Sequence, residues 1–133
     1  MLNVKPTLLI VDDEASIRTS LSHVFTEFGH SVRSAADGFA ALIEIRHEVP
    51  DILLSDLNMP GMSGFELLSV VRRRFPQIRV IAMSGAFSDD VVPPNVAADA
   101  FYRKGTGIEP LFRILDCLKD GARSLPREGE API

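Results

Sequence analysis

The sequence predicts an α/β fold in which a parallel sheet carries helices on both of its faces. Short apolar runs alternate with longer amphipathic stretches five times, which is the pattern of repeated strand–helix units. Three of the short runs are continuous in residues such as Val, Ile and Leu, as is typical of strands buried on both faces. The length of 133 residues allows one domain, which we expect at residues 1–120, followed by a flexible tail or the start of a linker at 121–133.

The first unit begins with the apolar run 8–11, which ends at Asp12 and Asp13. The next stretch has an apolar residue at every third or fourth position, which predicts a helix that ends near Gly29. Its inward face would consist of Ile17, Leu21, Val24, Phe25 and Phe28.

The second unit has weaker signals. Residues 31–35 are a short strand candidate, and Asp37 with Gly38 indicates a turn or a helix start, with Pro50 closing the unit. We expect this helix to turn three apolar side chains toward the core, Phe39, Leu42 and Ile43.

The third unit begins with the apolar run 52–54 and ends its strand at Asp56. Ser63 and Glu66 match the capping box that starts a helix, and the arginines at 72–74 suit a helix C-terminus better than a nucleic-acid site. The inward residues of this helix would be Phe65, Leu68, Val71 and Phe75.

Two further strand candidates follow, 80–83 ending at Ser84 and 98–102 ending just before Lys104. A last helix carries Leu111, Ile114, Leu115 and Leu118 on one face, and Thr106 and Pro110 compete as its start signal. Most of the phenylalanines lie on the helical stripes, so we expect them in the core.

Composition narrows the classes of function. The net charge of −4 gives no support to general nucleic-acid binding, and no apolar run approaches the length of a membrane span. The N-terminus lacks the apolar region of a signal peptide, so we expect a cytoplasmic protein. Cys117, the only cysteine, excludes an intrachain disulfide, and we expect it to be a partly buried structural thiol.

Polar residues stand where the strand candidates end, and the carboxyl ends of parallel strands form a crevice where ligands bind. These residues are Asp12, Asp13, Asp56, Ser84 and Lys104. Three carboxylates brought together should raise the pKa of at least one of them, and an all-oxygen ligand set suits Mg²⁺ rather than zinc. An ammonium and a hydroxyl beside the metal suit a phosphoryl group, which a carboxylate can accept as an aspartyl-phosphate. These arguments leave open which aspartate accepts it.

Four motifs in this order resemble the receiver domain of bacterial two-component response regulators. They are Val11-Asp12-Asp13-Glu14, Leu54-Ser55-Asp56-Leu57-Asn58-Met59-Pro60-Gly61-Met62-Ser63-Gly64, Met83-Ser84-Gly85 and Arg103-Lys104. The resemblance covers roughly residues 6–120. It implies a doubly wound, flavodoxin-like sheet of five parallel strands in the order 2-1-3-4-5.

The resemblance also implies roles for single residues. Asp56 would be the phosphoacceptor. Asp13 directly, Asp12 through water, Asp56 and the backbone carbonyl of Asn58 would hold Mg²⁺.

Three more residues match the family's phosphate and switch positions. Ser84 would bond the phosphoryl group and couple it to the switch, Lys104 would pair with the phosphate, and Phe101 would be the rotating aromatic residue. The implied partners are a sensor histidine kinase or phosphotransfer protein and an unknown downstream protein, with no direct contact to nucleic acid or membrane. We expect a monomer or a weak dimer.

Two positions depart from the family pattern. Gly105 stands where the family usually has a proline joined by a cis peptide bond, so this loop is either strained or trans with altered geometry. Pro93 and Pro94 interrupt the segment 87–96, where the family has a helix. We expect that helix, the fourth of the family, to be short, displaced or absent, which would alter the usual output surface.

The residues therefore favour a phosphorylation-dependent signalling switch rather than an enzyme. One alternative is an interaction module that works without phosphorylation, suggested by the irregular segment 87–96. The other is a Mg²⁺-dependent phosphatase, which the lack of any evident substrate-binding insertion in so short a chain disfavours.

Overall fold

The computed structural model describes residues 5–85 and 97–119, which form a five-stranded parallel sheet flanked by helices. The strands are β1 (Leu8–Val11), β2 (Val32–Ala35), β3 (Ile52–Asp56), β4 (Arg79–Ser84) and β5 (Ala100–Arg103). The helices are α1 (Ala15–Glu27), α2 (Gly38–His47), α3 (Gly64–Arg74) and α4 (Glu109–Lys119). The strand order β2-β1-β3-β4-β5 confirms the predicted sheet.

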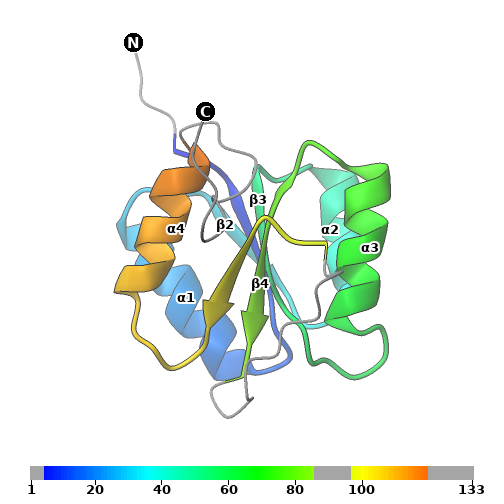
Figure 1. Ribbon diagram of the computed structural model, residues 1–133, viewed down its shortest axis with the longest axis horizontal. Coiled ribbons are helices and arrows are strands. Elements are labelled where there is room, and N and C mark those ends of the chain that lie inside the picture. Colours follow the sequence, from blue (N-terminus) through cyan, green and yellow to red (C-terminus); the bar gives the residue numbers. More distant parts are fainter. Residues whose placement is uncertain (1–4, 86–96, 120–133) are drawn as a thin grey trace, which may run out of the picture.

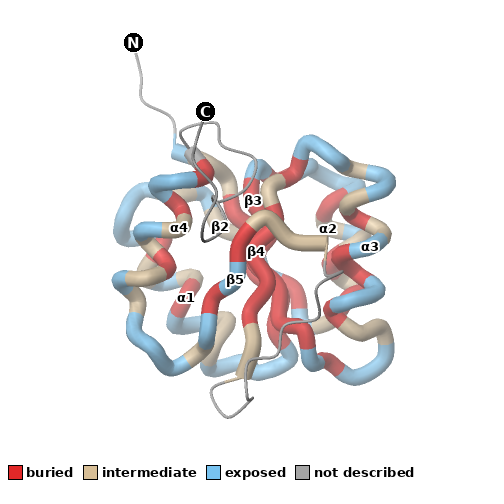
Figure 2. Tube along the Cα trace, in the orientation of Figure 1, coloured by how far each residue is buried: buried red, intermediate tan, exposed pale blue. Residues whose placement is uncertain are grey.

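Two helices cover each face of the sheet, α1 and α4 on one side and α2 and α3 on the other (Figure 1). Because side chains alternate along a strand, a strand in the middle of the sheet supplies both cores. Leu9 and Val11 of β1 pack in the core beneath α2 and α3, whereas Leu8 and Ile10 pack with α1 and α4. Figure 2 shows the result, a buried sheet between helices whose outer surfaces are exposed.

The strand register sets the position of the polar residues. Val11 at the end of β1 pairs with Ser55 in β3. Asp12 follows Val11 and Asp56 follows Ser55, so the two aspartates lie side by side on neighbouring strands. In the same way Asp56 pairs with Met83, and Ser84 pairs with Arg103. All of these strand ends therefore meet at one edge of the sheet.

Local signals account for the helix starts. The side chain of Ser63 accepts a hydrogen bond from Glu66 N–H at 3.2 Å, and the Glu66 carboxylate accepts one from Ser63 N–H, so the predicted capping box is confirmed. Asp37 caps α2 by accepting from Ala40 N–H at 2.8 Å. Thr106 instead donates its hydroxyl to the carbonyl of Arg103, and α4 begins with Pro110 in its first turn.

The predicted inward face of α2 is wrong. Phe39 is 61% exposed and Ile43 is 66% exposed, and Leu42 is only half-buried. The buried positions are Gly38, Ala41 and Ile45, which have the same helical spacing. These include two of the smallest side chains, and they let the helix approach the sheet closely while the larger residues of the other stripe face outward.

Three other burial predictions are also wrong. Phe28 follows the end of α1 and is 53% exposed, although its ring lies 4.6 Å from that of Phe112, centre to centre. Phe65 in the first turn of α3 is 37% exposed, and Cys117 is an exposed thiol on the outer side of α4. Among the other predicted positions on α3 and α4, Phe75 and Ile114 are only half-buried. The rest are buried as predicted, namely Leu68, Val71, Leu111, Leu115 and Leu118.

Two predictions concern residues outside the described part of the chain, the irregular segment 87–96 and the tail 121–133. Between β4 and β5, the described residues Gly85 and 97–99 contain no helix. No helix within residues 5–85 and 97–119 is long and apolar enough to cross a membrane.

Candidate functional site

Three carboxylates and an ammonium meet at the carboxyl ends of the strands. Asp12 and Asp13 follow β1, Asp56 ends β3, and Lys104 follows β5. Each aspartate offers a carboxylate oxygen within 4.8 Å of the others. Asp12 and Asp56 are buried, whereas Asp13 is exposed at the mouth of the site.

The Lys104 side chain joins the two buried carboxylates. Its Nζ lies 2.6 Å from Asp12 Oδ2 and 3.0 Å from Asp56 Oδ2. A third acid, Glu14, lies farther away, at 3.8 Å from the same nitrogen. Burial alone would lower the pKa of Lys104, but the hydrogen bonds and charges of Asp12 and Asp56 outweigh it, and the pKa is raised. The lysine is therefore held in its charged form.

Asp56 is fixed by a short loop and by the start of α3. Its Oδ1 accepts a hydrogen bond from Asn58 N–H at 3.1 Å. Gly64, the first residue of α3, lies so close to the strand end that a Cβ there would be 2.1 Å from the Asp56 carbonyl oxygen. Burial raises the pKa of the Asp56 carboxyl, while Lys104 and the Asn58 N–H pull it down without cancelling that effect. The charge of Asp12 adds only a smaller upward contribution, so the pKa of Asp56 is raised, as predicted, but mainly by burial rather than by crowding of the carboxylates.

Asp12 has one oxygen bound to the protein and one directed at the site. Its Oδ1 accepts a hydrogen bond from Glu14 N–H at 2.9 Å. Its Oδ2 is fully buried and has no hydrogen-bond partner of good geometry, so only the ionic contact with Lys104 compensates it. Three carboxylates gathered around a single ammonium, with this buried oxygen facing the other two acids, fit a hard divalent cation.

Ser84 and Phe101 occupy different positions relative to this cluster. Ser84 ends β4, and its carbonyl accepts a hydrogen bond from Lys104 N–H at 3.0 Å, which ties the lysine to the neighbouring strand. Phe101 in β5 is 41% exposed and lies on the outer side of that strand. The structure thus gathers the three aspartates and Lys104 directly, with Ser84 beside them and Phe101 at the surface.

The Lys104–Gly105 peptide bond is trans, since none of the described peptide bonds is cis. Gly105 takes a φ of +88°, a left-handed conformation that glycine adopts without strain. The lysine nevertheless reaches both buried carboxylates, so this departure from the family pattern does not displace it.

Two residues near the site had no role in the predictions from sequence. Glu14 contributes its N–H to Asp12 and its carboxylate to the surroundings of Lys104. Arg18, one turn further along α1, donates to the Asp12 carbonyl at 2.6 Å. Glu14 directly follows the Asp12–Asp13 pair, so its place in the sequence could have indicated that it lies near the site. The contact of Arg18 depends on the geometry of the turn, which the sequence does not show.

Comparison with known proteins agrees with this geometry. A family model described as the response regulator receiver domain matches residues 8–103. Sporulation initiation phosphotransferase F of Bacillus subtilis is 39% identical over 92 residues, which are 69% of this chain and 73% of that protein. Transcriptional regulatory protein AfsQ1 of Streptomyces coelicolor is 37% identical over 65% of this chain, but the match spans only 37% of AfsQ1.

Solved structures give the same result. The chemotaxis response regulator CheY4 of Vibrio cholerae is 30% identical with a TM-score of 0.76, over 86% of this chain and 98% of CheY4. The response regulator TrrA of Thermotoga maritima, in complex with Mg²⁺ and BeF, is 28% identical with a TM-score of 0.77, over 84% of this chain and 97% of TrrA.

Proposed function

The chain belongs to the response regulator receiver domain family, and on that premise we propose that it is a signalling switch that accepts a phosphoryl group on Asp56. One observation carries the assignment to Asp56. It is the buried acid in contact with Lys104 that ends the central strand, with Asn58 N–H on one oxygen and Lys104 on the other. Asp12 is also buried and has a similar pair of contacts, Glu14 N–H on one oxygen and Lys104 on the other, but it follows β1 rather than ending the central strand.

The donor we propose is a phosphohistidine of a sensor kinase or phosphotransfer protein. A carboxylate oxygen of Asp56 attacks the phosphorus, the phosphorus–nitrogen bond breaks, and the imidazole leaves with the electron pair and takes up a proton. Lys104, held charged between the carboxylates, is placed to offset the negative charge of the phosphoryl oxygens. The Ser84 hydroxyl would donate a hydrogen bond to the same group.

Mg²⁺ is the metal that the donor set favours. Asp12, Asp13, Asp56 and the carbonyl of Asn58 would hold it, and all of these ligands are oxygens. When bound, the ion would offset the charge of the carboxylates and of the phosphoryl group. The support from this chain is the cluster of three carboxylates, in which the buried Asp12 Oδ2 has Lys104 as its single charged partner among the described residues.

Phosphorylation would change protein contacts through β4 and β5. Ser84 and Lys104 are already linked by a main-chain hydrogen bond, so a phosphoryl group held by both would act on neighbouring strand ends together. Phe101 would then change its position at the surface of β5. The downstream partner would be another protein, met in the cytoplasm by a monomer or weak dimer, with no direct contact to nucleic acid or membrane.

A small acyl-phosphate donor with Mg²⁺ tests this proposal, followed by intact-mass spectrometry. The expected result is one added phosphoryl group, absent from Asp56→Asn and absent when EDTA removes the metal. Asp37→Asn is a matched control, because asparagine caps a helix as well as aspartate does and should leave labelling unchanged.

Other outcomes would support the alternatives. Absence of label from the folded protein with any acyl-phosphate donor would favour an interaction module that works without phosphorylation. Rapid multiple turnover of varied phosphomonoesters would favour a phosphatase. Labelling that persists in Asp56→Asn would move the acceptor to another residue.

A further inference from the structure

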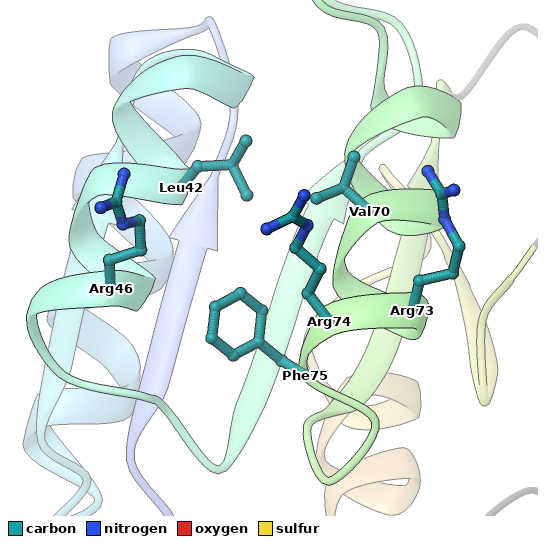
Figure 3. A pocket seen from close by; sticks show the side chains of 6 residues that line it. All are labelled: Leu42, Arg46, Val70, Arg73, Arg74 and Phe75. Atoms are coloured by element: carbon teal, nitrogen blue, oxygen red, sulfur yellow. The ribbon is translucent and has the colours of Figure 1, made fainter.

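A pocket lies between α2 and α3, at the far end of these helices from the carboxylate cluster (Figure 3). Its volume of about 500 Å³ is within the range of ligand-binding clefts. The lining residues are Leu42, Arg46, Val70, Arg73, Arg74 and Phe75. We propose that this α2–α3 groove is a docking site for an acidic amphipathic helix of a partner protein, and this proposal does not depend on phosphorylation of Asp56.

The floor of the groove is apolar. Leu42 points from α2 and Phe75 from the end of α3 into the space between the two helices, and Val70 lies on α3 across from Leu42 (Figure 3). All three are half-buried, so part of their apolar surface is open to solvent. Burying this surface beneath a partner would be favourable.

The apolar surface continues beyond the groove. Phe39 and Ile43 form one exposed stripe on α2, one turn apart, and Phe65 lines an adjoining pocket on α3. Exposed apolar side chains that gather on neighbouring elements commonly indicate an interaction surface. The two neighbouring helices α2 and α3 thus present apolar side chains on both sides of the groove. An amphipathic helix can lay its apolar face into a groove of this kind.

The rim of the groove is positively charged. Within residues 5–85 and 97–119, the side chains of Arg46, Arg73 and Arg74 form no ion pair. Other arginines on the same side of the sheet are paired, since Arg33 lies 3.0 Å from Glu44 and Arg72 lies 3.2 Å from Asp99. A favourable position at a helix C-terminus accounts for a positive charge on each helix. It does not account for three guanidinium groups around one apolar floor that have no ion pair in the described part of the chain.

The combination of an apolar floor and a positively charged rim favours an acidic amphipathic helix over a nucleic acid as the partner. Arginines flanking an apolar floor complement a helix with apolar residues on one face and Glu or Asp at its edges. A nucleic acid would make use of the arginines but not of Leu42 and Phe75, and the net charge of −4 opposes it. Glu66, exposed at the N-terminal end of α3, lines the adjoining pocket and would repel an acidic helix there, so the charged edge of the partner should lie toward the arginines.

Synthetic peptides test the proposal with the unphosphorylated full chain. The probe is a helical peptide of about 15 residues, with Leu and Phe on one face and Glu along both edges. Its matched partner carries Lys in place of every Glu, and a single-stranded oligonucleotide is the third probe. Fluorescence anisotropy measures affinity, and amide chemical shifts locate the binding site.

The acidic peptide should bind and shift amides of α2 and α3, and the lysine peptide should bind at least about tenfold more weakly. The double variant Arg46→Glu, Arg74→Glu should weaken acidic-peptide binding by at least about tenfold, because attraction becomes repulsion at both edges. Arg113→Glu is the matched control on exposed α4 and should leave affinity unchanged within about twofold. Circular dichroism shows that each variant is folded.

Three results would overturn the proposal. In the first, the acidic peptide shows no binding at millimolar concentration. In the second, it binds the double variant as tightly as the wild type. In the third, only the oligonucleotide shifts the α2 and α3 amides, which would assign the groove to nucleic acid. Failure of Asp56 to accept a phosphoryl group would leave these results unaffected.

Discussion

The Lys104 ammonium nitrogen lies 2.6 Å from Oδ2 of Asp12, a carboxylate with no exposed surface. This contact forms across the sheet, from the residue after β5 to the residue after β1, and it crosses the site in which Asp56 lies. It makes Lys104 the charge that allows two buried acids to coexist in the absence of a metal.

Lys104→Met should therefore destabilise the fold. Removing the ammonium leaves Asp12 and Asp56 buried without their cation, and breaking a buried ion pair in this way costs about 3 kcal/mol. Urea unfolding measures the loss, and added Mg²⁺ should recover part of it. Arg113→Met, which removes an arginine whose side chain is 72% exposed, should change stability by less than about 0.5 kcal/mol. Equal unfolding midpoints for Lys104→Met and the wild type would contradict the role given to the lysine.

Asp56→Asn should stabilise the protein at neutral pH. The folded-state pKa of Asp56 is raised above 3.8, so its ionised form costs stability when the pH is above that folded-state value. The cost is absent below the unfolded-state pKa, where the carboxyl is protonated in both states. The advantage of the variant in urea midpoint should thus shrink as the pH falls from about 8 to about 4. If the wild type were more stable than the variant at about pH 8, the attraction of Lys104 for the Asp56 carboxylate would outweigh the cost of burying that charge.

Mg²⁺ should raise the melting temperature through Asp13. Binding to the folded state alone contributes about 2.7 kcal/mol at a concentration one hundred times the dissociation constant. Asp13→Ala should remove most of this shift while keeping the fold, because Asp13 is exposed. Glu27→Ala is the control, an exposed acid at the other end of α1. If both variants keep the full shift in differential scanning calorimetry, the metal lies elsewhere.

Gly64→Ala should disrupt the approach of α3 to the end of β3. The added Cβ would lie 2.1 Å from the Asp56 carbonyl oxygen and 2.5 Å from Leu57 Cα, and backbone atoms cannot move aside cheaply. We expect a loss of at least about 2 kcal/mol in urea unfolding, with slower labelling of Asp56. Gly85→Ala, where a Cβ meets no described atom within 4 Å, should be nearly neutral. A similar effect of both substitutions would point to backbone entropy rather than to the close approach.

The sheet and the acidic site were predictable because single local signals determine them. Continuous apolar runs such as 52–54 are short and bounded by polar residues, which favours a strand buried on both faces. The side chains that end such strands must converge, because parallel strands end at the same edge. The capping box at Ser63 likewise leaves little choice for the start of α3.

The rotation of α2 was not predictable in the same way. Helical spacing is satisfied both by Phe39, Leu42 and Ile43 and by Gly38, Ala41 and Ile45, and hydropathy favours the first set. The structure buries the second set because small residues allow a close approach to the sheet. The position of Lys104 was uncertain for a different reason, since only the three-dimensional path of the loop shows that a trans peptide with Gly105 at a φ of +88° still delivers the lysine.

The acidic site and the α2–α3 groove lie at opposite ends of the same helices. Gly64 begins α3 beside Asp56, and Arg74 ends it at the groove, a separation of roughly 15 Å for ten residues of helix. A protein bound at one end therefore need not exclude a protein bound at the other. The phosphoryl donor and an acidic helix could then bind this small chain at the same time and form a ternary complex. Raising the concentration of one partner would not displace the other.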